Sequence, residues 1–167
     1  MNHVEHTLFI SESIDLVWAY ATELPRLTDW FPRAESVEGH INPGDEVGLR
    51  YSLHFGRLVR LNIETVEIHP LRTHRRAFRY PAWLLHGDVT MRFDPADGGT
   101  LVTFMVDYDF DVPLMAKALG AMQDARIQRI VLRSATNFKN YVEAKHFARR
   151  RAAIRDTTLA PSVNMLA

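Results

Sequence analysis

The sequence predicts one α+β domain, in which a seven-stranded antiparallel sheet wraps around a long C-terminal helix. Three observations support this fold class. Between residues 35 and 109, apolar and polar residues alternate, which is typical of half-buried strands. Between residues 114 and 147, apolar residues recur every three or four positions, as in an amphipathic helix. No strand–helix–strand alternation is present, which excludes the doubly wound α/β folds.

The N-terminal segment predicts one strand followed by two short helices. Residues 4–10 alternate and are rich in β-branched and aromatic side chains, so we expect a strand there. Ser11 or Ser13 is a suitable N-cap for the first helix. The second helix is expected from about residue 25 to residue 30, because Pro32 ends it. Together the two helices would form an elbow against the sheet.

Six further strands are expected between strong turn signals. The clearest turns are residues 42–45, Asn-Pro-Gly-Asp, and residues 94–99, Asp-Pro-Ala-Asp-Gly-Gly. The links between the strands are mostly of hairpin length, which favours antiparallel pairing. The expected strands are 37–41, 47–55, 59–64, 74–80, 85–93 and 100–110.

The last helix is expected from Leu114 to Phe147, with Asp111 and Pro113 at its start. A helix of that length spans on the order of 50 Å, so only a broad sheet covers its apolar side. The expected apolar stripe consists of Leu114, Ala118, Met122, Ile127, Ile130, Val131, Ser134, Phe138, Tyr141 and Val142. We therefore expect a domain of residues 1–148, followed by a loose tail at 149–167, where the apolar period fades.

Composition and charge exclude several classes of protein. With 167 residues, the chain is long enough for one domain with a substantial core. Its formal net charge of zero argues against a nucleic-acid-binding domain. The absence of cysteine excludes disulfides and thiol catalysis. No signal peptide and no apolar run of membrane-spanning length is visible, so we expect a cytoplasmic protein without stable membrane insertion.

The order of the elements and several short motifs resemble the START-like (SRPBCC) superfamily, in particular its polyketide cyclase/dehydrase and lipid-transport branch. The resemblance covers about residues 4–147. The motifs are Ile10 leading to Val17-Trp18, Trp30-Phe31-Pro32, Asp97-Gly98-Gly99-Thr100 and Phe138-Lys139. Members often have Ala-Pro before the first helix, where this chain has Glu12-Ser13. The resemblance implies the helix-grip fold, with a cavity between the concave sheet and the long helix that binds apolar or aromatic small molecules.

Aromatic side chains supply most of the candidate ligand-binding residues. Strand alternation places several of them on the core side of the sheet, and others lie in links where they would gate a cavity mouth. For each tyrosine, ordinary core packing is the alternative interpretation. The candidates are Trp30, Phe31, Tyr51, Phe78, Tyr80, Trp83, Phe104 and Tyr108.

Candidates for catalysis are few. His86 and Asp88 lie two apart on one expected strand, hence on the same face, and a His–carboxylate pair is a common general base. The alternative is that this face is solvated. Arg76 shares its strand face with Phe78 and Tyr80, and an inward arginine would suit a ligand carboxylate or phenolate.

Other charged residues give weaker signals. The eight histidines have no metal-ligand spacing, so we expect neither a metal nor a cofactor. Arg126, Arg129 and Arg133 form a basic stripe on the long helix. Nearby Asp124 and the overall neutrality favour a solvated face for that stripe.

Three functions follow from these observations. The leading hypothesis is non-covalent binding of a lipid- or polyketide-like hydrophobic or aromatic molecule. The first alternative is a polyketide cyclase/aromatase that catalyses aldol condensation and dehydration. The second is a protein-interaction module with a vestigial cavity. A homodimer is compatible with each of them.

Overall fold

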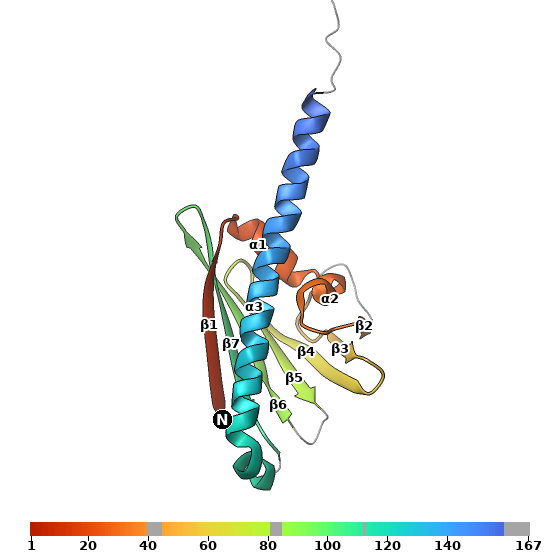
Figure 1. Ribbon diagram of the computed structural model, residues 1–167, viewed down its shortest axis with the longest axis vertical. Coiled ribbons are helices and arrows are strands. Elements are labelled where there is room, and N and C mark those ends of the chain that lie inside the picture. The colour runs from red at the N-terminus through yellow and green to blue at the C-terminus, as the bar shows by residue number, and fades with distance from the viewer. Residues whose placement is uncertain (40–44, 81–84, 112, 159–167) are drawn as a thin grey trace, which may run out of the picture.

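The computed structural model describes the backbone of residues 1–39, 45–80, 85–111 and 113–158. Within these ranges, the side chains of residues 113–123, 149, 150 and 152–158 are outside the description. Figure 1 shows a sheet with one long helix lying across it and two short helices beside that helix. The elements are β1 (Asn2–Ile10), α1 (Ile14–Thr22), the 3-10 helix η1 (Leu24–Arg26), α2 (Leu27–Trp30), β2 (Ser36–Gly39), β3 (Arg50–Phe55), β4 (Val59–His69), β5 (Thr73–Tyr80), β6 (Leu85–Ala96), β7 (Gly99–Asp109) and α3 (Pro113–Thr158).

The seven strands form one sheet in the order β1-β7-β6-β5-β4-β3-β2, with every neighbouring pair antiparallel. This confirms the predicted fold class. The short links produce the pairing, and glycines occupy two of the turns in which the backbone is left-handed. Gly56 has φ 66° between β3 and β4, and Gly98 has φ 73° between β6 and β7. Because β1 pairs with β7, the first and the last strand lie side by side at one edge of the sheet.

The helices cover one face of the sheet, which we call the inward face. α3 packs mainly on β1 and also contacts β7 and α2, while α1 lies on β6 and β7. α2 bridges α3 and β2. The three helices thus contact both edge strands, β1 and β2, as well as β6 and β7 (Figure 1).

The buried side of α3 follows the predicted period but is narrower than predicted. Val131, Phe138 and Val142 are buried, as is Ser134. The prediction that Ile130 lies on the apolar stripe is wrong. Ile130 is 38% exposed, because its position lies about 100° around the helix from that of Val131.

The C-terminal end of α3 also differs from the prediction. The helix continues to Thr158, well past the expected end at Phe147, since its arginines and alanines are good helix formers that need no buried face. The boundary predicted after residue 148 thus falls within the helix. Residues 159–167 lie outside the described residues, so a loose tail there stays a prediction. Among the helices that are described, none is both long and apolar enough to span a membrane.

We predict that Phe138→Ala lowers the free energy of unfolding by about 3–5 kcal/mol, because Phe138 is fully buried and its removal leaves a cavity. Urea denaturation monitored by circular dichroism measures this loss. Leu132→Ala is the matched control on the same helix, since Leu132 is 48% exposed, and it should change stability by less than about 1 kcal/mol. Equal losses in the two variants would show that the buried side of α3 is assigned wrongly.

Candidate functional site

A row of five directly paired residues crosses the inward face from β3 to β7. Successive register pairs join Tyr51 to Ile63, Ile63 to Phe78, Phe78 to Gly87, and Gly87 to Tyr108. Paired residues in a sheet point to the same side, so this row forms a continuous floor beneath the helices. Three candidate ligand-binding residues, Tyr51, Phe78 and Tyr108, are thus brought into one line. We refer to these five residues as the floor row.

Gly87 lies in the middle of the floor row, where the backbone of β7 approaches it closely. A Cβ atom built there would lie 2.1 Å from the carbonyl oxygen of Asp107, so only glycine fits without movement of the β7 backbone. Gly87 is therefore required for the close pairing of β6 with β7 between Phe78 and Tyr108.

Aromatic rings tie the floor to the helices. Phe138 of α3 contacts Trp30 of α2 with ring centroids 5.0 Å apart, and it contacts Phe104 of β7 at 6.0 Å. The chain of rings continues from Trp30 to Phe31 at 6.1 Å, and from Phe31 to Phe55 at 5.8 Å. The candidates Trp30, Phe31 and Phe104 therefore pack within one aromatic cluster that joins both helices to the sheet.

Three buried polar atoms in this region have no hydrogen-bond partner among the described residues. They are the hydroxyl of Tyr51, Nε1 of Trp30 and the hydroxyl of Ser134 on α3. These residues are only 3%, 4% and 5% exposed. An unpaired buried polar atom costs about 1–3 kcal/mol, so each one indicates a place where a water or a ligand atom binds. Burial raises the pKa of Tyr51 to about 12, which keeps its hydroxyl protonated at neutral pH.

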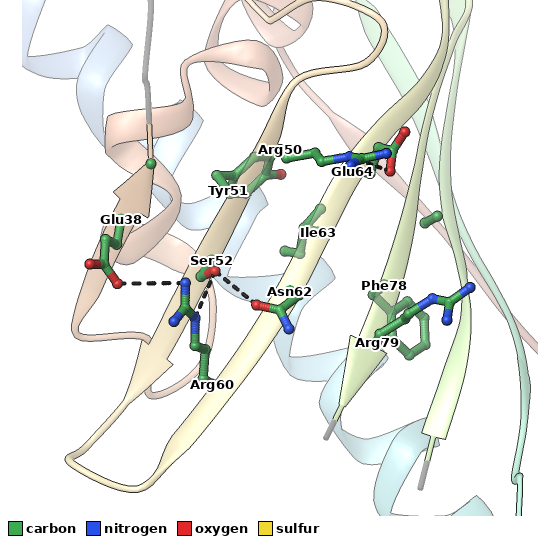
Figure 2. A pocket seen from close by; sticks show the side chains of 12 residues that line it. Glu38, Arg50, Tyr51, Ser52, Arg60, Asn62, Ile63, Glu64, Phe78 and Arg79 are labelled. Atoms are coloured by element: carbon green, nitrogen blue, oxygen red, sulfur yellow. Dashed lines mark hydrogen bonds and ion pairs between the residues drawn. The ribbon is translucent and has the colours of Figure 1, made fainter. Parts of the chain in front are cut away.

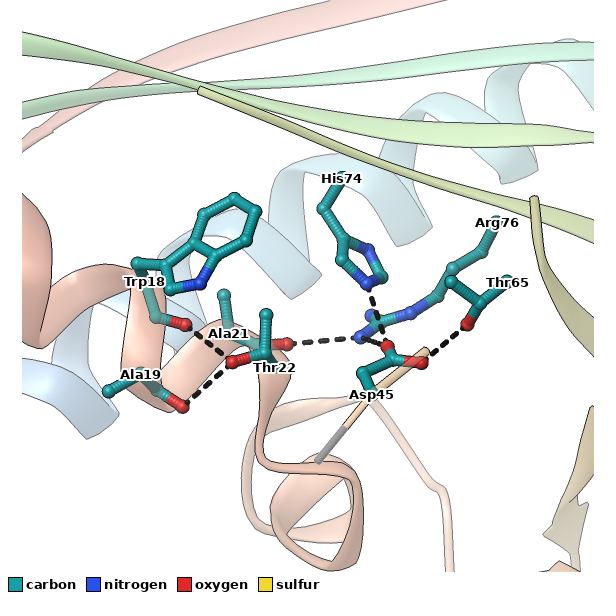
Figure 3. A network of polar contacts seen from close by, with 8 residues as sticks. All are labelled: Trp18, Ala19, Ala21, Thr22, Asp45, Thr65, His74 and Arg76. Atoms are coloured by element: carbon teal, nitrogen blue, oxygen red, sulfur yellow. Dashed lines mark hydrogen bonds and ion pairs between the residues drawn. The ribbon is translucent and has the colours of Figure 1, made fainter. Parts of the chain in front are cut away.

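A cluster of buried charges closes one end of the inward face (Figure 3). Asp45 Oδ2 lies 2.7 Å from His74 Nε2 and accepts a hydrogen bond of 2.9 Å from Arg76. Thr65 donates to the other carboxylate oxygen at 2.7 Å, and Arg76 also donates to the carbonyl of Ala21 in α1 at 3.1 Å. The side chains of Asp45 and His74 are each 1% exposed. We call Asp45, Thr65, His74 and Arg76 the Asp45 cluster.

The surroundings fix the charges in the Asp45 cluster. Burial alone would raise the pKa of Asp45, but the hydrogen bond from His74, the charge of Arg76 and the bond from Thr65 together lower it to about 2. The pKa of His74 is also lowered, because burial and the neighbouring Arg76 outweigh the attraction of Asp45. At neutral pH the cluster therefore holds a carboxylate, a guanidinium and a neutral imidazole.

Sequence reasoning found only part of this cluster. It named Arg76 as a candidate for the inward face, but it treated Asp45 as a turn residue and His74 as one of the histidines without metal-ligand spacing. The signal that was available is strand parity: His74, Arg76 and Phe78 share one face of β5. Two inward basic side chains require a buried acidic partner, and this points to a nearby carboxylate.

The other catalytic candidates lie on the opposite face of the sheet. Val89 and Met91 point inward, so His86 and Asp88 point outward. The His86 side chain is 42% exposed, and its Nδ1 lies 2.9 Å from Asp111 Oδ1. This is the solvated alternative considered above, and the pair does not face the floor row.

The remaining aromatic candidates have different environments. The hydroxyl of Tyr108 donates to Asp124 of α3, and burial together with this bond raises the pKa of Tyr108. Tyr80 is half-buried at the end of β5, where it pairs with Leu85 of β6. Trp83 lies outside the described residues.

A pocket of about 460 Å³ lies over strands β2 to β5 (Figure 2). Most of its polar side chains occupy the outward-facing strand positions, and ion pairs join Arg50 to Glu64 and Arg60 to Glu38. Arg50 donates to Glu64 at 2.8 Å, and Arg60 donates to Ser52 at 2.9 Å. Small-molecule sites are mostly apolar, so this charged depression is not the apolar cavity expected from the sequence. A second pocket lies between β1 and α3, beside Gln128 and Leu132.

No group of three or more metal-ligating side chains occurs among the residues searched, which are the described ones. The chemistry that the inward face offers is therefore that of apolar and aromatic walls, unpaired donors and one buried His–carboxylate–arginine cluster.

Comparisons with known proteins agree with this architecture. A family model described as "Polyketide cyclase / dehydrase and lipid transport" matches residues 1–143. No curated protein sequence matches the chain. Solved structures resemble it at low identity, which shows the fold alone.

Three of these structures illustrate the similarity. The Zhui aromatase/cyclase from a Streptomyces species is 20% identical, with a TM-score of 0.71 over 85% of this chain and 93% of its own. A conserved protein from Geobacillus kaustophilus is 11% identical, with a TM-score of 0.69 over 86% and 96%. A protein from Thermus thermophilus is 21% identical, with a TM-score of 0.66 over 86% and 99%.

We predict that Asp45→Asn lowers the free energy of unfolding by about 3–5 kcal/mol, because it leaves Arg76 buried without an anionic partner. Chemical denaturation at neutral pH measures the loss. Asp94→Asn is the matched control, since Asp94 pairs with Arg92 at the same 2.9 Å but both side chains are half-exposed. That change should cost less than about 1 kcal/mol. Similar losses in both variants would contradict a special role for the buried cluster.

The same cluster predicts acid sensitivity of the wild-type protein. Both folded-state pKa values are lowered from ordinary values of 6.5 for His74 and 3.8 for Asp45, so the unfolded chain binds protons first. The free energy of unfolding therefore begins to fall below about pH 6.5, because His74 takes up a proton more readily in the unfolded chain. It falls by about a further 2 kcal/mol as the pH drops from about 4 towards 2, through Asp45. Asp45→Asn should lack the second step, and a variant that kept it would refute the assignment.

Proposed function

Because the chain belongs to the polyketide cyclase/dehydrase and lipid transport family, we propose that it binds a hydrophobic or aromatic small molecule between the floor row and α3. The observation that carries this proposal is the set of buried, unpartnered polar atoms on Tyr51, Trp30 and Ser134. They come from the sheet, α2 and α3, which are the elements that bound this space. Apolar walls with a few fixed polar groups are typical of small-molecule sites.

The chemistry of these atoms suggests which ligands fit. An indole N–H only donates hydrogen bonds, and the hydroxyl of Tyr51 is kept protonated by burial. Nε of Arg76 is a further buried donor without a partner among the described residues. An excess of donors favours a ligand with carbonyl or phenolic oxygens over a saturated hydrocarbon.

A second candidate function is cyclisation of a poly-β-keto chain, and the Asp45 cluster favours it. A neutral His74 beside a carboxylate has the composition of a general base. In such a reaction, the base would take a proton from a methylene between two carbonyls, and the resulting enolate carbon would form a bond to another carbonyl carbon. The new alkoxide would take up a proton, and loss of water would complete the dehydration. Arg76 is placed to stabilise the enolate oxygen.

We predict that Tyr51→Phe weakens binding of a naphthol-type fluorescent probe about three- to tenfold, because one hydrogen bond to the ligand is lost. Fluorescence titration measures the dissociation constant. Tyr108→Phe is the matched control: it removes a hydroxyl that already has a partner in Asp124 and keeps the ring, so its affinity should equal that of wild type. Equal affinities of wild type and Tyr51→Phe would remove Tyr51 from the binding site.

His74→Gln separates the two functions. If the protein is a cyclase, a synthetic poly-ketone should be converted to an aromatic product by wild type, and the variant should be slower by about 10²–10⁴-fold, the usual contribution of a general base. If the protein is a carrier, neither protein should form product. Native mass spectrometry of freshly purified protein would then show an unchanged small molecule retained by wild type. Product formed equally by both proteins would exclude His74 as the base.

A further inference from the structure

Charge in this neutral protein is divided between α3 and the rest of the chain. α3 carries ten basic and three acidic residues, a formal charge of +7 with histidine neutral. The other residues include ten basic and seventeen acidic ones, a formal charge of −7. A net charge of zero therefore conceals a strongly basic helix on an acidic body, and this arrangement orients the molecule in the field of a charged surface.

The positive charge is exposed on the side of α3 that points away from the sheet. We define the outward face of α3 by seven of its exposed residues, the arginines and large apolar residues Arg126, Arg129, Ile130, Leu132, Arg133, Phe147 and Arg151. Among the described residues, no ion pair joins these arginines to an acidic side chain, although Glu143 lies 3.8 Å from Lys139 of the same helix. Asp124 accepts a hydrogen bond from Tyr108 of the sheet. Glu143 accepts one from the hydroxyl of Ser11 at 3.1 Å.

Large apolar side chains stand among these arginines. Phe147 is 64% exposed, Leu132 is 48% exposed and Ile130 is 38% exposed. The guanidinium of Arg151 lies over the Phe147 ring, 5.8 Å from its centroid. Helices that combine a basic surface with exposed Phe and Leu are typical of proteins that lie in the headgroup region of a bilayer.

The helix also continues beyond the part of the chain that matches the family. The family model ends at residue 143, whereas α3 extends to Thr158 and projects past the sheet (Figure 1). From Lys145 to Arg155 the sequence contains five basic residues and no acidic one. This projecting segment carries Phe147, whose side chain is 64% exposed.

We propose that the outward face of α3 docks this protein on an anionic lipid surface, with the helix in the headgroup plane. The basic residues attract the phosphate groups of the lipid headgroups. Phe147, Leu132 and Ile130 enter the boundary between the headgroups and the acyl chains. The acidic body is repelled and stays on the aqueous side. A nucleic-acid duplex would satisfy the arginines but leave these apolar side chains in water. Docking of this kind does not depend on the ligand proposed above.

Vesicle co-sedimentation tests the docking surface. Wild-type protein should bind vesicles that contain about one third phosphatidylserine at least tenfold more tightly than vesicles of phosphatidylcholine alone, and about 1 M salt should abolish binding. Arg129→Glu with Arg133→Glu should weaken binding at least tenfold. Arg57→Glu with Arg72→Glu is the matched control, since both arginines are exposed on other elements and the net charge changes equally. It should stay within about threefold of wild type.

Phe147→Ser tests the apolar part of the surface. It should weaken binding to the anionic vesicles about threefold or more without changing the net charge, and thermal melts should show that all variants stay folded, because every altered side chain is exposed. The proposal fails if wild type does not bind the anionic vesicles, or if the two double variants bind equally. It also fails if duplex DNA binds while vesicles do not. Self-association at low salt that Arg129→Glu with Arg133→Glu abolishes, without vesicle binding, would instead assign this face to a second copy of the chain.

Discussion

The contact of Phe138 with Trp30 and Phe104 holds the inward face together. It is the point at which α3, α2 and the sheet meet through aromatic rings 5.0 and 6.0 Å apart. α3 packs mainly on β1, and the ring contacts of Phe138 add a link from α3 to α2 and to β7. Phe138 therefore helps to fix the position of α3 over the sheet.

The Asp45 cluster places a second constraint on the same space. Burial of a carboxylate, a guanidinium and an imidazole gives less stability than apolar packing of the same volume. The cluster instead fixes the positions of the elements around it, because Arg76 donates hydrogen bonds to Ala21 of α1 and to Asp45 in the segment before β3. It therefore closes one end of the inward face with polar groups, while the aromatic cluster forms its wall. An interior with one polar end and apolar walls suits an elongated ligand with an oxygenated end, and it also provides the only inward acid–base pair among the described residues.

The sequence predicted the sheet well because strand alternation is a local property. Tyr51, Phe78, Phe104 and Tyr108 were placed on the core side by strand parity, and they are buried. Errors arose where long-range contacts decide the outcome. Asp45 lies in a segment with turn composition, and only the fold brings it to His74 and Arg76. His86 and Asp88 share a face as predicted, but the pairing of β6 with both neighbours turns that face to solvent.

The inward and the outward side of α3 have different proposed roles, and neighbouring residues lie on different sides. Ser134 faces the interior with an unpartnered hydroxyl, whereas Arg133, the residue before it, is exposed on the outward face. One residue of separation is enough because consecutive positions on a helix differ by about 100°. A hydrophobic ligand that leaves the interior would therefore need to cross little more than the thickness of one helix, about 10 Å, to reach the surface on which we propose α3 lies. Substitutions at Arg129 and Arg133 act on the outer side without touching Trp30, Tyr51 or Ser134, so the two proposals can fail independently of each other.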